Sequence, residues 1–93
     1  MHIQDLRIFS RVADVLSITS VGNEFQISPG TVSKKLQAFE KELGVQLFER
    51  TTRSIRITPE GERFLSDARH IIATVDDAIA SVDEAGGQIR GML

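Results

Sequence analysis

The feature that most constrains the fold is a gap of only three residues, Gln26-Ile27-Ser28, between two segments with helical patterns. In the first segment, Thr19 can cap a short helix whose buried side would be Val21, Gly22 and Phe25. Two helices joined by so short a turn must pack at a steep angle. The sequence therefore predicts a helix-turn-helix.

The segment after the gap, "SPGTVSKKLQAFEKELG", combines helix-breaking residues with a strong helical pattern. Ser28 can cap the helix and Pro29 suits its first position, where proline loses no hydrogen bond. At about 100° per residue, one narrow stripe holds Val32, Leu36, Phe39 and Leu43. The opposite side holds Gly30, Lys34, Gln37 and Lys41. Lys35 lies at the buried edge and can reach water by snorkelling, and Gly44 suits the helix end.

Gly30 has two interpretations. Glycine costs roughly 1 kcal/mol against alanine within a helix, so its presence indicates close approach by another molecule. A tight contact between helices of the same chain would explain it equally well.

Other elements flank this pair of helices. A first amphipathic helix spans residues 5–16, with apolar residues at Leu6, Phe9, Val12, Ala13 and Leu16. After Gly44 the pattern changes period: Leu47-Phe48 is followed by a polar tip and then by the alternating Ile55-Arg56-Ile57. This pattern predicts a two-stranded hairpin with a basic tip.

A long helix follows, with Thr58 as N-cap and Pro59 at its first position. It should end at Gly86-Gly87 and be about 40 Å long. A domain this small cannot cover that length, so the apolar seam predicts pairing with the same helix of a second chain. The predicted dimerisation residues are Phe64, Leu65, Ala68, Ile71, Ile72, Val75, Ile79 and Val82.

Together these elements predict a mainly α chain: a winged helix-turn-helix of three helices and a two-stranded wing, followed by a long linker and dimerisation helix. The expected boundaries are residues 1–58 for the winged domain, 59–85 for the linker helix and 86–93 for a hinge.

Charge is distributed unevenly along the chain. The formal net charge is −2, yet residues 28–57 carry six basic and three acidic side chains, a local excess of +3. A local basic patch governs phosphate contact more than the overall charge does. No run of residues is long and apolar enough to span a bilayer, and there is no cysteine for a disulfide or thiolate metal site.

The sequence shows no set of residues that would support catalysis. His2 and His70 have no carboxylate or serine partner at a suitable spacing, and no metalloprotease, P-loop or nucleophile-elbow motif is present. We therefore expect no catalytic residue, no metal and no cofactor in this chain.

The predicted elements agree better with nucleic-acid binding than with catalysis. In a winged helix-turn-helix, the second helix of the motif enters the major groove and the wing follows the backbone. With no Trp or Tyr, the chain lacks a stacking platform for single strands, so duplex DNA is the expected partner. The candidate DNA-binding residues are Ser28, Pro29, Gly30, Thr31, Ser33, Lys34, Gln37, Arg50, Thr51, Thr52, Arg53 and Arg56. The alternative is a dimerising protein-interaction module that does not read DNA.

The segment from Ile18 to Leu65 closely resembles the N-terminal region of LysR-type bacterial transcriptional regulators, and the resemblance runs from about residue 3 to the end of the chain. The resemblance rests on Phe9, Val12, Ser17, Thr19, Ser28, Ser33, Leu36, Phe39-Glu40, Leu43-Gly44, Leu47-Phe48, Arg50, Thr58, Gly61 and Leu65. It implies a cytoplasmic, nucleoid-associated homodimer that binds an interrupted inverted repeat, with tetramers as an option for the full-length protein. It also implies a further, C-terminal domain, absent here, that binds a small-molecule effector.

Two positions depart from the family pattern. Many members have an Ala-Ala pair where this chain has Val21-Gly22, a change expected to slacken the packing of that helix. Many also have a base-reading glutamine at the position of Pro29, which cannot hydrogen-bond a base edge. Readout there would depend on contact with a thymine methyl or on DNA shape.

Overall fold

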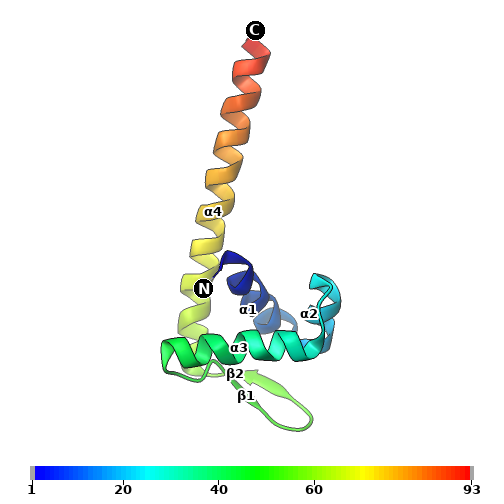
Figure 1. Cartoon of the computed structure of the whole chain (residues 1–93). Coiled ribbons are helices and arrows are strands. Elements are labelled where there is room, and N and C mark those ends of the chain that lie inside the picture. The colour runs from blue at the N-terminus through cyan, green and yellow to red at the C-terminus, as the bar shows by residue number, and fades with distance from the viewer. Residues whose placement is uncertain (1, 93) are drawn as a thin grey trace.

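A computed structural model of the chain describes the backbone of residues 2–92 and the side chains of residues 2–83. Three helices form the body of the molecule, a hairpin lies beside the third, and a long helix leads away from them (Figure 1). The elements are α1 (Ile3–Val15), α2 (Ile18–Phe25), α3 (Pro29–Leu43), β1 (Phe48–Arg50), β2 (Ile55–Ile57) and α4 (Pro59–Met92). The predicted winged helix-turn-helix with a long following helix is confirmed.

The helix-turn-helix consists of α2 and α3. Ser17 caps α2, because its hydroxyl accepts a hydrogen bond from the backbone N–H of Ser20 at 3.1 Å. The prediction that Thr19 caps this helix is wrong: the cap and the helix start both lie two residues earlier, at Ser17 and Ile18, and Thr19 lies in the first turn. Ser28 caps α3 as predicted, by accepting from the N–H of Thr31 at 3.1 Å.

Gly22 packs closely against the turn. A Cβ atom at this position would lie 2.7 Å from the carbonyl oxygen of Ile27, closer than real contacts allow. The expectation that the Val21-Gly22 pair slackens this helix is therefore wrong, because Val21 is fully buried and the missing side chain of Gly22 lets the turn approach.

The core is built around Phe9 of α1, which is completely buried. Its ring centroid lies 5.5 Å from that of Phe48 and 5.2 Å from that of Phe64, so the first strand and α4 converge on it. The buried stripe of α3 contributes Val32, Leu36 and Phe39 as predicted. The prediction is wrong for Leu43, which is 37% exposed because it lines an open surface pocket with Phe64 and Arg63 of α4 and is not enclosed by them.

The predicted hairpin is confirmed. Its strands are antiparallel, with Phe48 opposite Ile57 and Arg50 opposite Ile55. The side chain of Glu40 accepts hydrogen bonds from the N–H groups of Leu47 and Phe48 at 2.8 and 3.2 Å, which fixes the first strand to the end of α3.

Thr58 joins the hairpin to α4 and caps the helix as predicted. Its buried hydroxyl donates to the Gln46 carbonyl at 2.6 Å and accepts from the N–H of Gly61 at 2.9 Å. The backbone of α4 continues to Met92, so the expected helix end at Gly86-Gly87 is wrong. Glycine costs helix stability without removing a backbone hydrogen bond, and so it need not end a helix. The hinge assigned to residues 86–93 remains a prediction.

The apolar stripe of α4 has two parts. Ala68 is fully buried, and Phe64, Leu65 and Ile72 pack against the core of the same chain. The seam assignment of Ala68 is therefore wrong, and the other three are largely used within the protomer. Ile71, Ile79 and Val82 remain exposed at 43%, 54% and 71%, with Val75 partly covered. This second part of the predicted seam is the more exposed and therefore the more available to a partner.

Candidate nucleic-acid interface

The outward face of α3 is the largest feature of the candidate site. Gly30, Lys34 and Gln37 lie on it and are exposed, as is Lys41 in the last turn of the helix. The face is opposite the buried stripe because residues four and seven positions apart share one side of a helix. The helix begins with Ser28 and Pro29, both exposed, so its N-terminal end is open to a ligand.

The hydroxyl groups at the start of α3 have partners within the chain. Ser28 Oγ lies 2.8 Å from Thr31 Oγ1, in addition to its capping bond with the Thr31 N–H. The Ser28 hydroxyl therefore serves mainly to cap α3. The Thr31 hydroxyl has fewer contacts within the chain and can still form a hydrogen bond with a ligand.

The two adjacent lysines differ in surroundings. Lys35 Nζ donates to Asp5 Oδ1 at 2.9 Å, which ties α3 to the first helix, and the Lys35 side chain is 36% exposed. Lys34 is exposed and has no ion-pair or hydrogen-bond partner among residues 2–83. Of the pair, Lys34 is the cation available for DNA, in agreement with the helical projection.

The Asp5–Lys35 pair also changes the titration of Asp5. Partial burial raises the pKa of the Asp5 carboxyl group, but hydrogen bonds from Lys35 Nζ and from the His2 backbone N–H lower it by more. The result is a pKa below the ordinary value of 3.8, so Asp5 is charged at neutral pH and holds Lys35 in place.

Arg50 connects the wing to α3. One of its guanidinium nitrogens, Nη1, donates to Ser33 Oγ at 3.0 Å. The wing therefore lies beside α3 (Figure 1), with Arg50 and Ser33 at the junction. Both residues were predicted to contact DNA, and the structure shows that they also contact each other.

The wing tip is a short turn held by Thr51, whose side-chain oxygen accepts from the N–H groups of Arg53 and Ser54 at 3.3 and 3.0 Å. Arg53 is exposed and has no ion-pair partner among the side chains of residues 2–83. Arg56 is different, since it pairs across the strands with Glu49 at 3.3 Å. Of the wing arginines, Arg56 alone has an acidic partner among the side chains of residues 2–83, so the charges of Arg50 and Arg53 are both free for phosphate, with Arg53 at the exposed tip.

Gly30 faces open space. A Cβ atom there would meet only Ser28 Oγ, at 3.8 Å, which is an ordinary contact. The interpretation of Gly30 as a tight contact between helices of this chain is therefore wrong. Approach by another molecule is the interpretation that remains.

The structure adds one segment that sequence reasoning missed. A groove between the wing and the start of α2 is lined by Ser17, Ile18 and Thr19 on one side and by Arg50 to Ile55 on the other. Thr19 is exposed within the first turn of α2, where helix N-termini favour anions. Recognising Ser17 as the cap would have placed Thr19 on this surface.

Other types of site have little support in the described part of the chain. His2 and His70 are both exposed. Within residues 2–83, no three His, Cys, Asp or Glu side chains are grouped so that they could hold a metal ion. Among the described helices, none combines the length and apolar character needed to cross a membrane.

The chain is similar to known bacterial regulators. The family described as "Bacterial regulatory helix-turn-helix protein, lysR family" matches residues 3–62. The HTH-type transcriptional regulator DmlR of Escherichia coli (strain K12) is 36% identical over 91 residues, which are 98% of this chain and 30% of DmlR. BudR of Raoultella terrigena is 35% identical over 92 residues, or 99% of this chain and 31% of BudR. The chain thus spans about three tenths of the length of these curated relatives.

Solved structures agree in shape over nearly the whole chain. A crystal structure of a BenM_DBD/catB site 1 DNA complex superposes with a TM-score of 0.88 at 31% identity, covering 95% of both chains. A crystal structure of a CbnR_DBD-DNA complex gives a TM-score of 0.85 at 30% identity, covering 92% of this chain and 99% of the other. The fold, the order of its elements and the match over residues 3–62 lead to one conclusion: this chain belongs to the lysR family of bacterial regulatory helix-turn-helix proteins.

Proposed function

We propose that the chain binds double-stranded DNA sequence-specifically, as the DNA-binding part of a LysR-type transcriptional regulator. The observation that carries this proposal is the unpartnered, cationic outward face of α3, which opens at Gly30 and includes Lys34. The wing, with the exposed Arg53 at its tip, lies beside this helix. This is the layout with which a winged helix-turn-helix addresses a major groove and the adjoining backbone.

The proposal includes a homodimer. Ile71, Ile79 and Val82 are exposed apolar residues of α4, and Ile79 and Val82 follow Asp76, after the contacts of the helix with the winged domain. The far part of α4 leads away from the winged domain (Figure 1). Pairing these stripes would remove apolar surface from water and place two α3 helices on an interrupted inverted repeat.

The wider role follows from the family. A regulator of this kind acts on promoter DNA in the cytoplasm, at the nucleoid, and we propose no catalytic activity for it. We further propose that the effector binds a C-terminal domain like the one that longer family members carry, that this chain itself needs no cofactor, and that tetramers form through regions outside this chain.

Selection from random duplex DNA is the direct test. We expect enrichment of a sequence with two-fold symmetry and a spacer between its halves. Enrichment of no sequence would contradict the proposed function and favour the dimerising interaction module.

The salt dependence of binding to the selected duplex tests the role of Arg53. Arg53→Ala should lower the slope of log affinity against log salt by about one unit, because one phosphate contact is lost. Arg56→Ala is the matched control; since Glu49 already offsets that charge, its slope should change less. Equal slopes for the wild type and Arg53→Ala would contradict the assignment of Arg53.

A further inference from the structure

Two ion pairs join α1 to α4 in a reciprocal order. Arg7 donates two hydrogen bonds to the carboxylate of Asp76, at 2.6 and 3.3 Å, and Arg69 donates to the carboxylate of Asp14. On each helix the two charged residues are seven positions apart, which places them on one side. On both helices the arginine precedes the aspartate along the chain. Each arginine can therefore face an aspartate of the other helix only when α4 runs antiparallel to α1 in this register.

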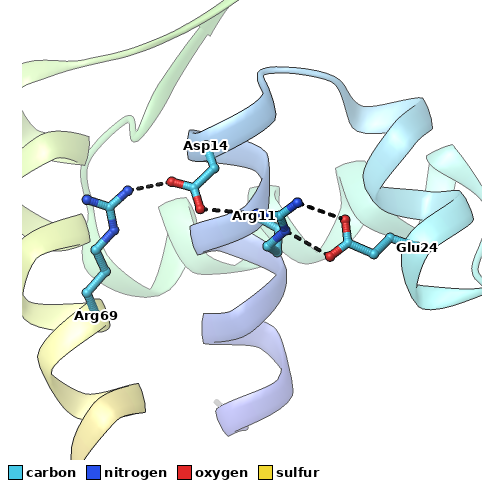
Figure 2. Close-up of polar contacts among 4 residues, drawn as sticks. All are labelled: Arg11, Asp14, Glu24 and Arg69. Carbon is cyan, nitrogen blue, oxygen red and sulfur yellow. Dashed lines mark hydrogen bonds and ion pairs between the residues drawn. The ribbon is translucent and has the colours of Figure 1, made fainter.

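The pairing continues to α2. Arg11 donates to Asp14 at 3.4 Å and to both oxygens of Glu24, at 2.8 and 3.3 Å. Figure 2 shows Asp14 between Arg69 of α4 on one side and Arg11 on the other, with Glu24 of α2 beyond. A continuous set of charges thus connects the long helix to the helix-turn-helix.

Among the described side chains of α4, up to residue 83, Asp76 is the last with a hydrogen bond to the winged domain. Residues 76–83 are all exposed, and the residues of α4 packed on the core end at Ile72. The hydrogen bond between the two side chains raises the pKa of Arg7 and lowers that of Asp76, as expected for two groups that are both charged when paired. The Arg7–Asp76 pair therefore restrains α4 where its apolar contacts have ended.

The direction of α4 matters because a small change in its angle moves the far end of the helix by a larger distance. Sixteen residues of α4 follow Asp76, a length of about 24 Å. A tilt of roughly 10° would displace the far end by about 4 Å, close to the 3.4 Å rise of one base pair. In a dimer joined through this part of α4, that displacement changes the separation of the two recognition helices.

We propose that Arg7, Asp14, Arg69 and Asp76 are positioning residues that set the angle between α4 and the winged domain, and thereby the half-site spacing that the dimer selects. Exposed ion pairs contribute little to the free energy of unfolding. Their effect here is on direction: they hold α4 against α1 beyond Ile72, the last residue of the helix that packs on the core. The part of the inference that concerns half-site spacing rests on the proposed function; the part that concerns the angle does not.

The angle can be measured within one chain. Because the sequence has no cysteine, Asn23→Cys and Ser81→Cys, both at exposed positions, can carry two spin labels, diluted with unlabelled protein. We expect Asp76→Arg to broaden or shift the distance distribution by pulsed EPR, and the charge-swapped Arg7→Glu/Asp76→Arg to restore it. Asp77→Arg, the same change at an exposed neighbour, should leave it unaltered. Identical distributions in all four proteins would overturn the inference.

The consequence for DNA is measured on a selected duplex and on versions with the spacer one base pair longer or shorter. Asp76→Arg should reduce the preference for the selected spacer by about two- to fivefold, the range of one exposed pair, and the charge swap should restore it. Affinity for a single half-site should stay unchanged. An unaltered preference would overturn the link to spacing. A wild-type chain that binds no duplex would contradict the proposed function, while the EPR result would still decide the angle.

Discussion

Two glycines of the helix-turn-helix differ in what a side chain would meet. At Gly22 a Cβ atom would lie 2.7 Å from the Ile27 carbonyl oxygen, whereas at Gly30 the nearest atom would be Ser28 Oγ at 3.8 Å. The first glycine is required by packing within the chain. The second removes bulk from the end of α3 that faces outward, next to Pro29.

We expect Gly22→Ala to lower the free energy of unfolding by about 1–3 kcal/mol, because the added methyl group must push the turn away. Gly30→Ala is the matched control: it should leave stability unchanged or raise it by up to about 1 kcal/mol. Urea denaturation of both variants checks this. Equal midpoints for the wild type and Gly22→Ala would show that the turn relaxes without cost.

Gly30→Ala should nevertheless weaken binding to the selected duplex, because the methyl group occupies the surface closest to the groove. We expect a loss of about tenfold or less, measured by fluorescence anisotropy, which corresponds to about 1.4 kcal/mol. Unchanged affinity would mean that the open space at Gly30 has no part in binding.

At the scale of elements, α3 is held from both sides. Lys35 pairs with Asp5 of α1, and Ser33 accepts a hydrogen bond from Arg50 of the wing. These contacts fix the rotation of α3 and therefore the direction in which Lys34 points. Sequence periodicity predicted which side of α3 is buried, but it could not predict these partners, which are 30 and 17 residues away.

The Arg50–Ser33 contact predicts coupling between wing and helix. In a double-mutant cycle of Ser33→Ala and Arg50→Ala, we expect the losses in DNA affinity to be non-additive by about 0.5–1 kcal/mol, as for residues in contact. The same cycle with Ser33→Ala and Arg53→Ala serves as the control and should be additive. Additive losses in the first cycle would contradict a joint role.

The Asp5–Lys35 pair predicts a pH dependence of stability. Since the pKa of Asp5 is lower in the folded state, the unfolded state binds more protons in this range, and stability rises with pH. The contribution is present above the ordinary pKa of 3.8 and is lost as the pH falls through the folded value. Asp5→Asn should therefore lose less stability than the wild type between pH 5 and pH 3, measured by urea denaturation. Parallel curves would contradict the assignment.

At the scale of the molecule, one apolar stripe on α4 serves two purposes. Its first half, around Ala68, closes the core of the protomer, and its second half, around Ile79, is exposed. Spacing along the sequence is the same in both halves. The two halves differ because the helix is longer than the domain on which it packs (Figure 1).

Glutamate substitutions test the different roles of the two halves of the α4 stripe. Ile79→Glu should leave the fold intact, within about 0.5 kcal/mol, but give monomers and much weaker DNA binding. Ile71→Glu and Val75→Glu should act in the same direction. Ala68→Glu should unfold the domain, because it buries a charge at a fully covered position. Sedimentation and circular dichroism distinguish these outcomes, with Ala80→Glu as the exposed control. A dimeric Ile79→Glu chain would show that the seam lies elsewhere.

Local sequence patterns were enough to predict the type and order of the elements and most of their buried faces. The caps at Ser28 and Thr58, the buried stripe of α3 and the alternation in the hairpin all follow from local backbone and side-chain preferences. Residue type and periodicity also placed Lys34 and Arg53 on the surface, so most of the candidate site was predictable.

Tertiary structure decided how those faces are used. Periodicity shows that Leu43 and Ala68 belong to apolar stripes, but only the extent of the neighbouring elements makes one exposed and the other buried. Likewise, only packing distinguishes Gly22 from Gly30, and only the fold brings Arg7 within reach of Asp76, 69 residues away. Local patterns record the direction of a side chain, whereas burial and pairing depend on what the rest of the chain places opposite it.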